Sequence, residues 1–171
     1  AQVLIEQALA KVCAEALDAA VVAGSGASGQ PLGLATLSGI DTRTGSTFTH
    51  AMAHAMEKVA EGYGASDSIA WLAGVDAAED FRTRERAAGS GFIAEAGTML
   101  GRPLVVSRSM GAATALCMPW SQFHLASWNA LEVQADPMTY FSTGRVILRV
   151  IWSVDFAVER PGAVAYASAV S

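Results

Sequence analysis

The spacing of apolar residues changes along this chain from a helical period to a strand period, and this change restricts the possible folds more than any other feature. Near the N-terminus, Ile5, Leu9 and Val12 recur at the spacing of one helix face, and this helix should end at Gly24. In residues 145–156, apolar and polar residues alternate, which is typical of a half-buried strand. The sequence therefore predicts an α+β fold with helices mainly in the first half.

Turn residues divide the rest of the chain into further helices and strands. One helix is expected over residues 46–61, and another from Asp76 to about Arg86, where Asp76 and Glu79 have the spacing of a capping box. Strands are expected over residues 69–73, 103–107, 113–118, 127–134 and 163–167. The strands over 103–107 and 113–118 are continuous apolar runs, so we expect both to be buried.

The chain is rich in apolar residues and poor in charge. Its 171 residues are 52% hydrophobic and 16% charged, whereas globular domains have about 25% charged residues. This composition argues against intrinsic disorder, and the net charge of −5 argues against a charge-rich nucleic-acid binder. The length predicts one globular unit, or one unit of two lobes. The apolar excess suggests surfaces that a partner buries.

Neither a disulfide framework nor a membrane segment is expected. The two cysteines, Cys13 and Cys117, are too few and too far apart for a framework, which favours a reducing compartment. The longest stretch without an acidic or basic residue, 109–131, contains Pro119, Gln122 and His124 and would cross a bilayer poorly. No basic start precedes an apolar run at the N-terminus, so no signal peptide is predicted.

A glycine motif near the first helix is not a nucleotide site. Residues 24–29 (GSGASG) match GxGxxG letter for letter. That motif binds a pyrophosphate only when a strand precedes it and a helix follows it. Here a helix precedes it and Pro31 follows it, so we interpret the segment as a turn at a helix end.

One arrangement could hold a metal ion. His50 and His54 are four residues apart on a predicted helix, and Glu57 continues the same face. The glutamate of a zinc protease is absent, because Ala51 follows His50. A solvated polar face is the favoured interpretation of these three residues. The two cysteines lie on apolar segments, where thiols are inert. We therefore predict no catalytic, cofactor-binding or metal-binding residue.

Several segments occur in a recognisable order across almost the whole chain. They are residues 17–26 (LDAAVVAGSG), 30–34 (QPLGL) and 100–107 (LGRPLVVS), then Phe141, a strand that ends in Asp155, and residues 160–163 (RPGA). This ordered series resembles the major capsid protein of tailed bacteriophages, whose fold is shared by encapsulin shells.

The resemblance implies an architecture of two domains. It places the end of the spine helix of the peripheral domain at residues 1–30, the axial domain at 31–123, the hairpin strands of the peripheral domain at 124–157, and a strand returning to the axial domain at 158–171. The family's N-terminal arm and extended hairpin have no match here, so a chain truncated at the N-terminus is expected.

The resemblance also implies which residues matter for assembly. The tip of the hairpin is expected near contacts between capsomers, through Asp136, Pro137, Met138, Tyr140 and Phe141. A structural turn is expected at Gly24, Gly26, Pro31 and Gly33.

The predicted function is that of a structural subunit of a phage or prophage icosahedral capsid, which self-assembles into pentamers and hexamers that enclose DNA. Expected partners are copies of itself and scaffold, portal and decoration proteins, with no membrane and no sequence-specific nucleic acid. The expected location is the virion capsid, and the bacterial cytoplasm during assembly. Two alternatives stay open: an encapsulin-type nanocompartment shell protein, and, less favoured, a metal-dependent enzyme using His50, His54 and Glu57.

Overall fold

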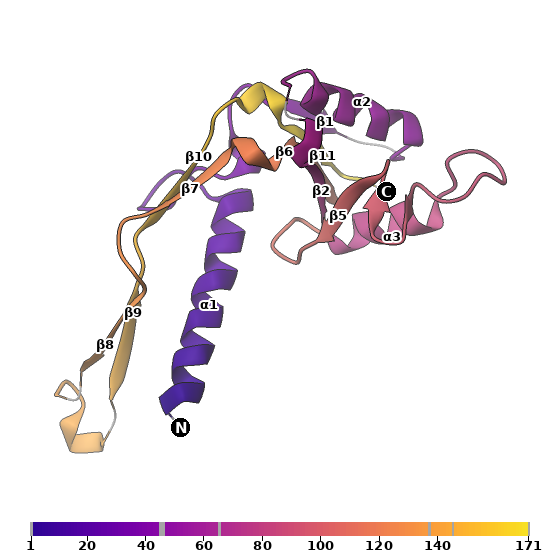
Figure 1. Cartoon of the computed structure of the whole chain (residues 1–171). Coiled ribbons are helices and arrows are strands. Elements are labelled where there is room, and N and C mark those ends of the chain that lie inside the picture. The colour runs from indigo at the N-terminus through magenta and orange to yellow at the C-terminus, as the bar shows by residue number, and fades with distance from the viewer. Residues whose placement is uncertain (1, 45–46, 65, 137, 145, 171) are drawn as a thin grey trace.

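The computed structural model describes residues 2–44, 47–64, 66–136, 138–144 and 146–170. Figure 1 shows that these residues form a compact part and an elongated part. The compact part contains a seven-stranded sheet with helices α2 and α3, and the elongated part contains helix α1 beside two successive two-stranded ribbons. Among the described residues, no helix combines the length and the apolar character needed to cross a membrane.

The α+β class predicted from the sequence is confirmed, with every α-helix of the described chain in its first half. The helices are α1 (Gln2–Ala23), α2 (His50–Glu61) and α3 (Val75–Thr83), with 3₁₀ helices η1 (Leu34–Thr36), η2 (Ser66–Ser68), η3 (Trp120–Gln122), η4 (Phe141–Thr143) and η5 (Pro161–Ala163). The strands are β1 (Asp41–Thr44), β2 (Ile69–Ala73), β3 (Ala94–Glu95), β4 (Thr98–Met99), β5 (Arg102–Val106), β6 (Thr114–Pro119), β7 (Phe123–Ser127), β8 (Glu132–Asp136), β9 (Ile147–Ile151), β10 (Val154–Val158) and β11 (Ala165–Ser168).

Helix α2 begins at His50, later than the predicted start at residue 46. The hydroxyl of Thr49 accepts a hydrogen bond from the N–H of Met52 at 3.2 Å, so Thr49 is the N-cap. From there, Ala53 and Met56 turn toward the sheet and are fully buried. The cap and the apolar stripe together determine where the helix starts and which face it buries.

The predicted capping box of α3 is wrong. Gly74 is the N-cap and makes no side-chain hydrogen bond, while Asp76 lies within the first turn. The N–H groups of Asp76 and Ala77 donate instead to the carbonyl of Ala112, each at 3.1 Å. Because the loop before β6 supplies this acceptor, the first turn needs no capping side chain. The helix also ends at Thr83, earlier than predicted.

The sheet has the strand order β1-β11-β6-β2-β5-β4-β3. Strand β2 pairs antiparallel with β6 and parallel with β5. Helices α2 and α3 cover one face, where Trp71, Phe48 and Phe81 form the centre of the larger core. The end of α1 and η1 cover part of the other face, around Leu116 and Met118.

The elongated part contains two antiparallel ribbons in succession, β7 with β10 and then β8 with β9. The single strands predicted over 127–134 and 145–156 are therefore wrong, because each is divided into two. At the junction, the indole N–H of Trp152 donates to the hydroxyl of Ser127 at 2.9 Å. Both strands of the first ribbon therefore continue into the second ribbon at the same level.

Candidate subunit-contact surfaces

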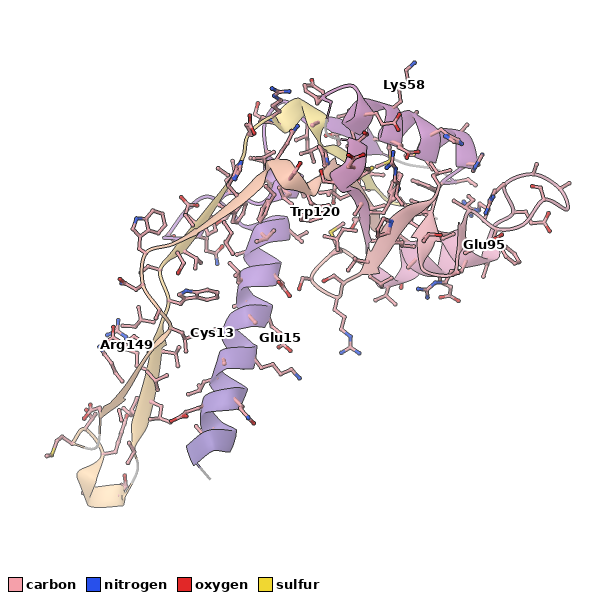
Figure 2. All side chains as sticks on the ribbon, viewed as in Figure 1. Cys13, Glu15, Lys58, Glu95, Trp120 and Arg149 are labelled. Carbon is pink, nitrogen blue, oxygen red and sulfur yellow. The ribbon has the colours of Figure 1, made fainter. Side chains whose placement is uncertain are left out.

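Helix α1 is apolar on much of its circumference but packs against the chain on one side only. Leu9, Cys13 and Leu17 are half-buried. Figure 2 shows Cys13 on the side facing the ribbons and Glu15 on the side facing away. Val12 lies outside this contact and is 61% exposed. Helices with so much apolar surface are normally covered on several sides, so α1 offers a surface to another molecule.

Apolar grooves separate α1 from the ribbons. The first has a volume of about 520 Å³ and is lined by Ile5 and Leu9 of α1 and by Val133 and Leu148 of the ribbon. The second has a volume of about 330 Å³ and lies beside Cys13 and Trp152. A two-stranded ribbon is marginally stable in water by itself, so this elongated part would gain from further coverage.

The tip of the ribbon is an ordered turn. The carboxylate of Asp136 accepts a hydrogen bond from the N–H of Met138 at 2.8 Å and one from the N–H of Thr139 at 3.3 Å. The hydroxyl of Thr139 donates to the same carboxylate. This is the self-bonding pattern by which aspartate stabilises turns.

Several apolar side chains at this tip are exposed to solvent. Met138 is 76% exposed, Val146 58% and Tyr140 47%. Pro137 lies outside the described residues, and Phe141 begins η4. Four of the contact candidates implied by the resemblance, Asp136, Met138, Tyr140 and Phe141, therefore lie on or beside one turn at the end of the β8–β9 ribbon. A fixed turn with a large exposed apolar side chain suits docking against a neighbour.

The turn should weaken in acid. Hydrogen bonds from the Thr139 hydroxyl, and then from the N–H groups of Met138 and Thr139, lower the pKa of Asp136 below its ordinary 3.8. Because the pKa is lowered in the folded chain, the stabilisation is complete above 3.8 and is lost as the pH falls through the lowered value. We expect the amide resonance of Met138 to follow this titration in NMR spectra, and Asp136→Ala to remove the dependence. Asp67→Ala should leave it intact, and an unchanged Met138 titration in Asp136→Ala would contradict the assignment.

A closed loop joins α1 to the compact part. The N–H of Gly24 donates to the carbonyl of Ala20 at 2.9 Å, and the N–H of Gly33 donates to the carbonyl of Gly24 at 2.9 Å. Between them, the N–H of Gly26 donates to the carbonyl of Pro31 at 3.2 Å, with Gly26 at φ +68°. The four residues that the resemblance implies as a structural turn therefore bond to one another or to the end of α1.

The histidine pair lies on successive turns of α2. The rings of His50 and His54 touch edge to face with centroids 4.5 Å apart, and burial, then His54 and Arg86, lower the pKa of His50. Glu57 turns to the sheet, where its carboxylate accepts a hydrogen bond from Arg102 at 2.9 Å. Within the part of the chain that the structure describes, no three His, Cys, Asp or Glu side chains come together as a metal site would require.

The thiol of Cys117 is buried in β6. Burial, and then the charge of Glu57, raise the pKa of Cys117 far above its ordinary value. The thiolate is the reactive form of cysteine, so this thiol is not poised as a nucleophile.

The sequence did not reveal one further surface, on the sheet face that α1 and η1 leave open. Strand β5 was expected to be buried, yet Val105, which pairs with Leu72 on this face, is 54% exposed. Val106, which pairs with Ala73 on the opposite face, is 37% exposed. Leu72, Val105 and Trp120 line an apolar groove of about 410 Å³ there. A continuous apolar run is the pattern of a strand buried on both faces. The same apolar run occurs in a strand that leaves one face open for a partner, so no sequence signal could have located this groove.

The fold and these surfaces define a class of protein. Apolar side chains are exposed on α1, on the ribbon tip and on the sheet, and these surfaces are spread over different faces. This is the pattern of a protein that associates through several surfaces at once. The chain belongs to the Phage capsid family, whose model matches residues 1–169.

Solved structures agree with this assignment. The capsid of the empty GTA particle, computed with C5 symmetry, superposes with a TM-score of 0.79 at 15% identity, covering 99% of this chain and 66% of that one. The structure of Gordonia phage Cozz superposes with a TM-score of 0.69 at 12% identity, covering 96% of this chain and 62% of that one. The virus-like particle from Pyrococcus furiosus superposes with a TM-score of 0.61 at 8% identity, covering 87% of this chain and 61% of that one.

These likenesses show the fold, and they show that the chain spans about two thirds or less of the length of these solved chains. No curated protein matches the chain. The resemblance found in the ordered motifs is thus confirmed at the level of family and fold.

Proposed function

We propose that this chain is a structural subunit of a phage or prophage icosahedral capsid, which self-assembles into pentamers and hexamers that enclose DNA. The observation that carries this proposal is the apolar surface of α1 and the ribbons, which a single copy leaves uncovered. Family membership supports it independently. A protein that must be covered by neighbours on several sides is suited to a closed shell of identical subunits.

The two parts would have different tasks in the shell. Residues 1–30 and 124–157 would form the peripheral domain, and 31–123 with 158–171 the axial domain around the centre of a capsomer. The ribbon tip, with Asp136, Pro137, Met138, Tyr140 and Phe141, would contact a neighbouring capsomer. The exposed fractions of Met138 and Tyr140 support this role.

The proposed partners are copies of this chain, with scaffold, portal and decoration proteins as further partners during assembly. The net charge of −5 argues against tight contacts with the phosphates of enclosed DNA. The chain would act in the virion capsid after assembly in the bacterial cytoplasm. The family points to a structural protein rather than an enzyme.

A charge on α1 tests this function without disturbing the fold. Val12 is 61% exposed, so Val12→Asp should change the free energy of unfolding by less than about 0.5 kcal/mol. In an assembly that covers α1, the same charge would be buried without a partner and should weaken self-association by about tenfold or more. Sedimentation velocity and negative-stain electron microscopy would measure how much of each variant forms rings or shells.

Gln7→Asp is the matched control, because it adds the same charge at a polar exposed position of α1. It should assemble like the unsubstituted chain. A chain that stays monomeric at every concentration and salt condition would contradict the proposed function.

The encapsulin-type nanocompartment is the second candidate. The ordered motifs support it equally, because encapsulin shells share the fold that they resemble, and a virus-like particle from Pyrococcus furiosus also superposes with a TM-score of 0.61. The contents of isolated particles separate the two functions: packaged DNA supports a capsid, and packaged cargo protein supports a compartment.

A further inference from the structure

The uncovered sheet face extends as one groove toward α1. The 410 Å³ groove at Leu72, Val105 and Trp120 is continued by a cavity of about 300 Å³ that shares these three residues and reaches Asp18 and Leu125. Leu125 is 49% exposed and Val105 54%. The groove is therefore apolar along its floor and has an acidic side chain at one end.

A second feature lies on the other side of the compact part. Residues 85–92, which we call the 85–92 hairpin, connect α3 to β3 and project away from α1 (Figure 1). Glu85 and Phe92 pair across its base. Its tip consists of small residues, and Ala87 and Ala88 are exposed there.

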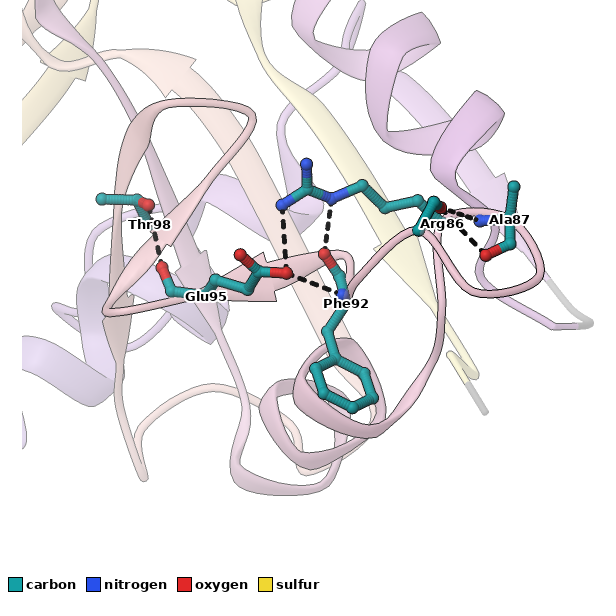
Figure 3. Close-up of polar contacts among 6 residues, drawn as sticks. Arg86, Ala87, Phe92, Glu95 and Thr98 are labelled. Carbon is teal, nitrogen blue, oxygen red and sulfur yellow. Dashed lines mark hydrogen bonds and ion pairs between the residues drawn. The ribbon is translucent and has the colours of Figure 1, made fainter.

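The 85–92 hairpin is held rigidly. The N–H of Arg86 donates to the carbonyl of Gly91 at 2.8 Å, and the N–H of Ala87 donates to the hydroxyl of Ser90 at 2.9 Å. Figure 3 shows the guanidinium of Arg86 turned toward the carbonyl of Phe92, at 2.5 Å, and toward the carboxylate of Glu95, at 3.4 Å. A segment ordered in advance loses little conformational entropy when it binds.

The charges beside the two features are opposite. Arg82, on the last turn of α3 before the hairpin, is exposed, and so is Asp18 at the end of the groove. Neither makes an ion pair with another residue in the described ranges. Complementary charges of this kind orient an approaching partner.

We propose that the 85–92 hairpin of one copy inserts into the groove formed by Leu72, Val105 and Trp120 of a neighbouring copy, with Arg82 of the first copy facing Asp18 of the second. A copy cannot fill its own groove, because α3 packs on the sheet face opposite the groove and the hairpin projects away from α1. The contact is therefore heterologous, and it generates a ring when the rotation that relates successive copies closes. This inference rests on the proposed self-assembly and identifies one contact within it.

Paired cysteines test the contact. In a Cys13→Ser background, Ala88→Cys combined with Val105→Cys should give a ladder of disulfide-linked oligomers under a mild oxidant on a non-reducing gel. Both positions are exposed, so the fold should tolerate them, and the native Cys117 is buried. The matched control is Lys58→Cys with Val105→Cys, since Lys58 is exposed near the end of α2 that lies farther from the hairpin (Figure 2) and should give no ladder.

A charge exchange provides a second readout. Asp18→Arg and Arg82→Asp should each weaken self-association by about fivefold, and the double variant should recover it. A chain that assembles but shows neither the ladder nor the recovery overturns this contact and leaves the proposed function standing. A chain that never assembles contradicts the proposed function and this contact together.

Discussion

Gly33→Ala is expected to destabilise the protein by about 3 kcal/mol. The backbone of Gly33 has φ −66° and ψ 153°, a conformation that alanine adopts freely, so the cost is steric. A Cβ there would lie 2.4 Å from the nitrogen of Gly24, 2.7 Å from the nitrogen of Ala23 and 2.7 Å from the carbonyl oxygen of Val22. All three are backbone atoms at the end of α1. No rotamer change relieves such contacts, so the loop must move away from the helix and lose its hydrogen bond to Gly24.

Urea unfolding followed by circular dichroism would measure this loss. Gly62→Ala is the matched control, because Gly62 has φ −58° and ψ −16° and the nearest atoms to its added Cβ lie at 3.4 Å. That substitution should be neutral or stabilising by a few tenths of a kcal/mol. Equal stability of the Gly33→Ala and Gly62→Ala variants would show that the loop and the end of α1 are not in close contact in solution.

The sequence predicts the elements that follow from local chemistry. The end of α1 at Ala23 follows from Gly24 and the proline beyond it, and the bounds of β2 follow from a short apolar run between turn residues. The predicted start of α3 is wrong because the first N–H groups of this helix bond to Ala112, which lies far along the chain. A propensity argument cannot detect an acceptor that tertiary structure supplies.

The candidate contact surfaces were only partly predictable, for a related reason. The exposed tip at Met138 was implied by family resemblance, and the apolar excess of the composition suggested buried partner surfaces. The positions of the other surfaces depend on which strand faces remain open after folding. Val105 is apolar in the sequence whether α1, η1 or another subunit covers it. Only the arrangement of the elements shows that it is left exposed.

Arg102→Ala is expected to destabilise the compact part by about 2 kcal/mol, which is less than the cost of breaking a fully buried ion pair because the pair is partly exposed. The guanidinium joins β5 to two other elements. It donates to the carboxylates of Glu57 at 2.9 Å and Glu61 at 3.1 Å, and to the carbonyl of Ser66 at 2.8 Å. The hydrogen bond to Glu57 is the main reason that the pKa of Arg102 is raised.

The cost should come mainly from Glu57. Its side chain is only 11% exposed, so removal of Arg102 leaves a carboxylate with little access to water and without its cation. Adding Glu57→Gln to Arg102→Ala should recover part of the stability at neutral pH.

Glu61→Gln is the control for the second carboxylate. The Glu61 side chain is 47% exposed, so its replacement should cost less than about 1 kcal/mol at neutral pH. Thermal unfolding of the unsubstituted chain and the three variants at neutral pH shows whether the cost comes from an uncompensated charge or from lost packing. If Glu57→Gln brought no recovery to Arg102→Ala, then lost packing of the arginine side chain, rather than an uncompensated charge, would be the cause.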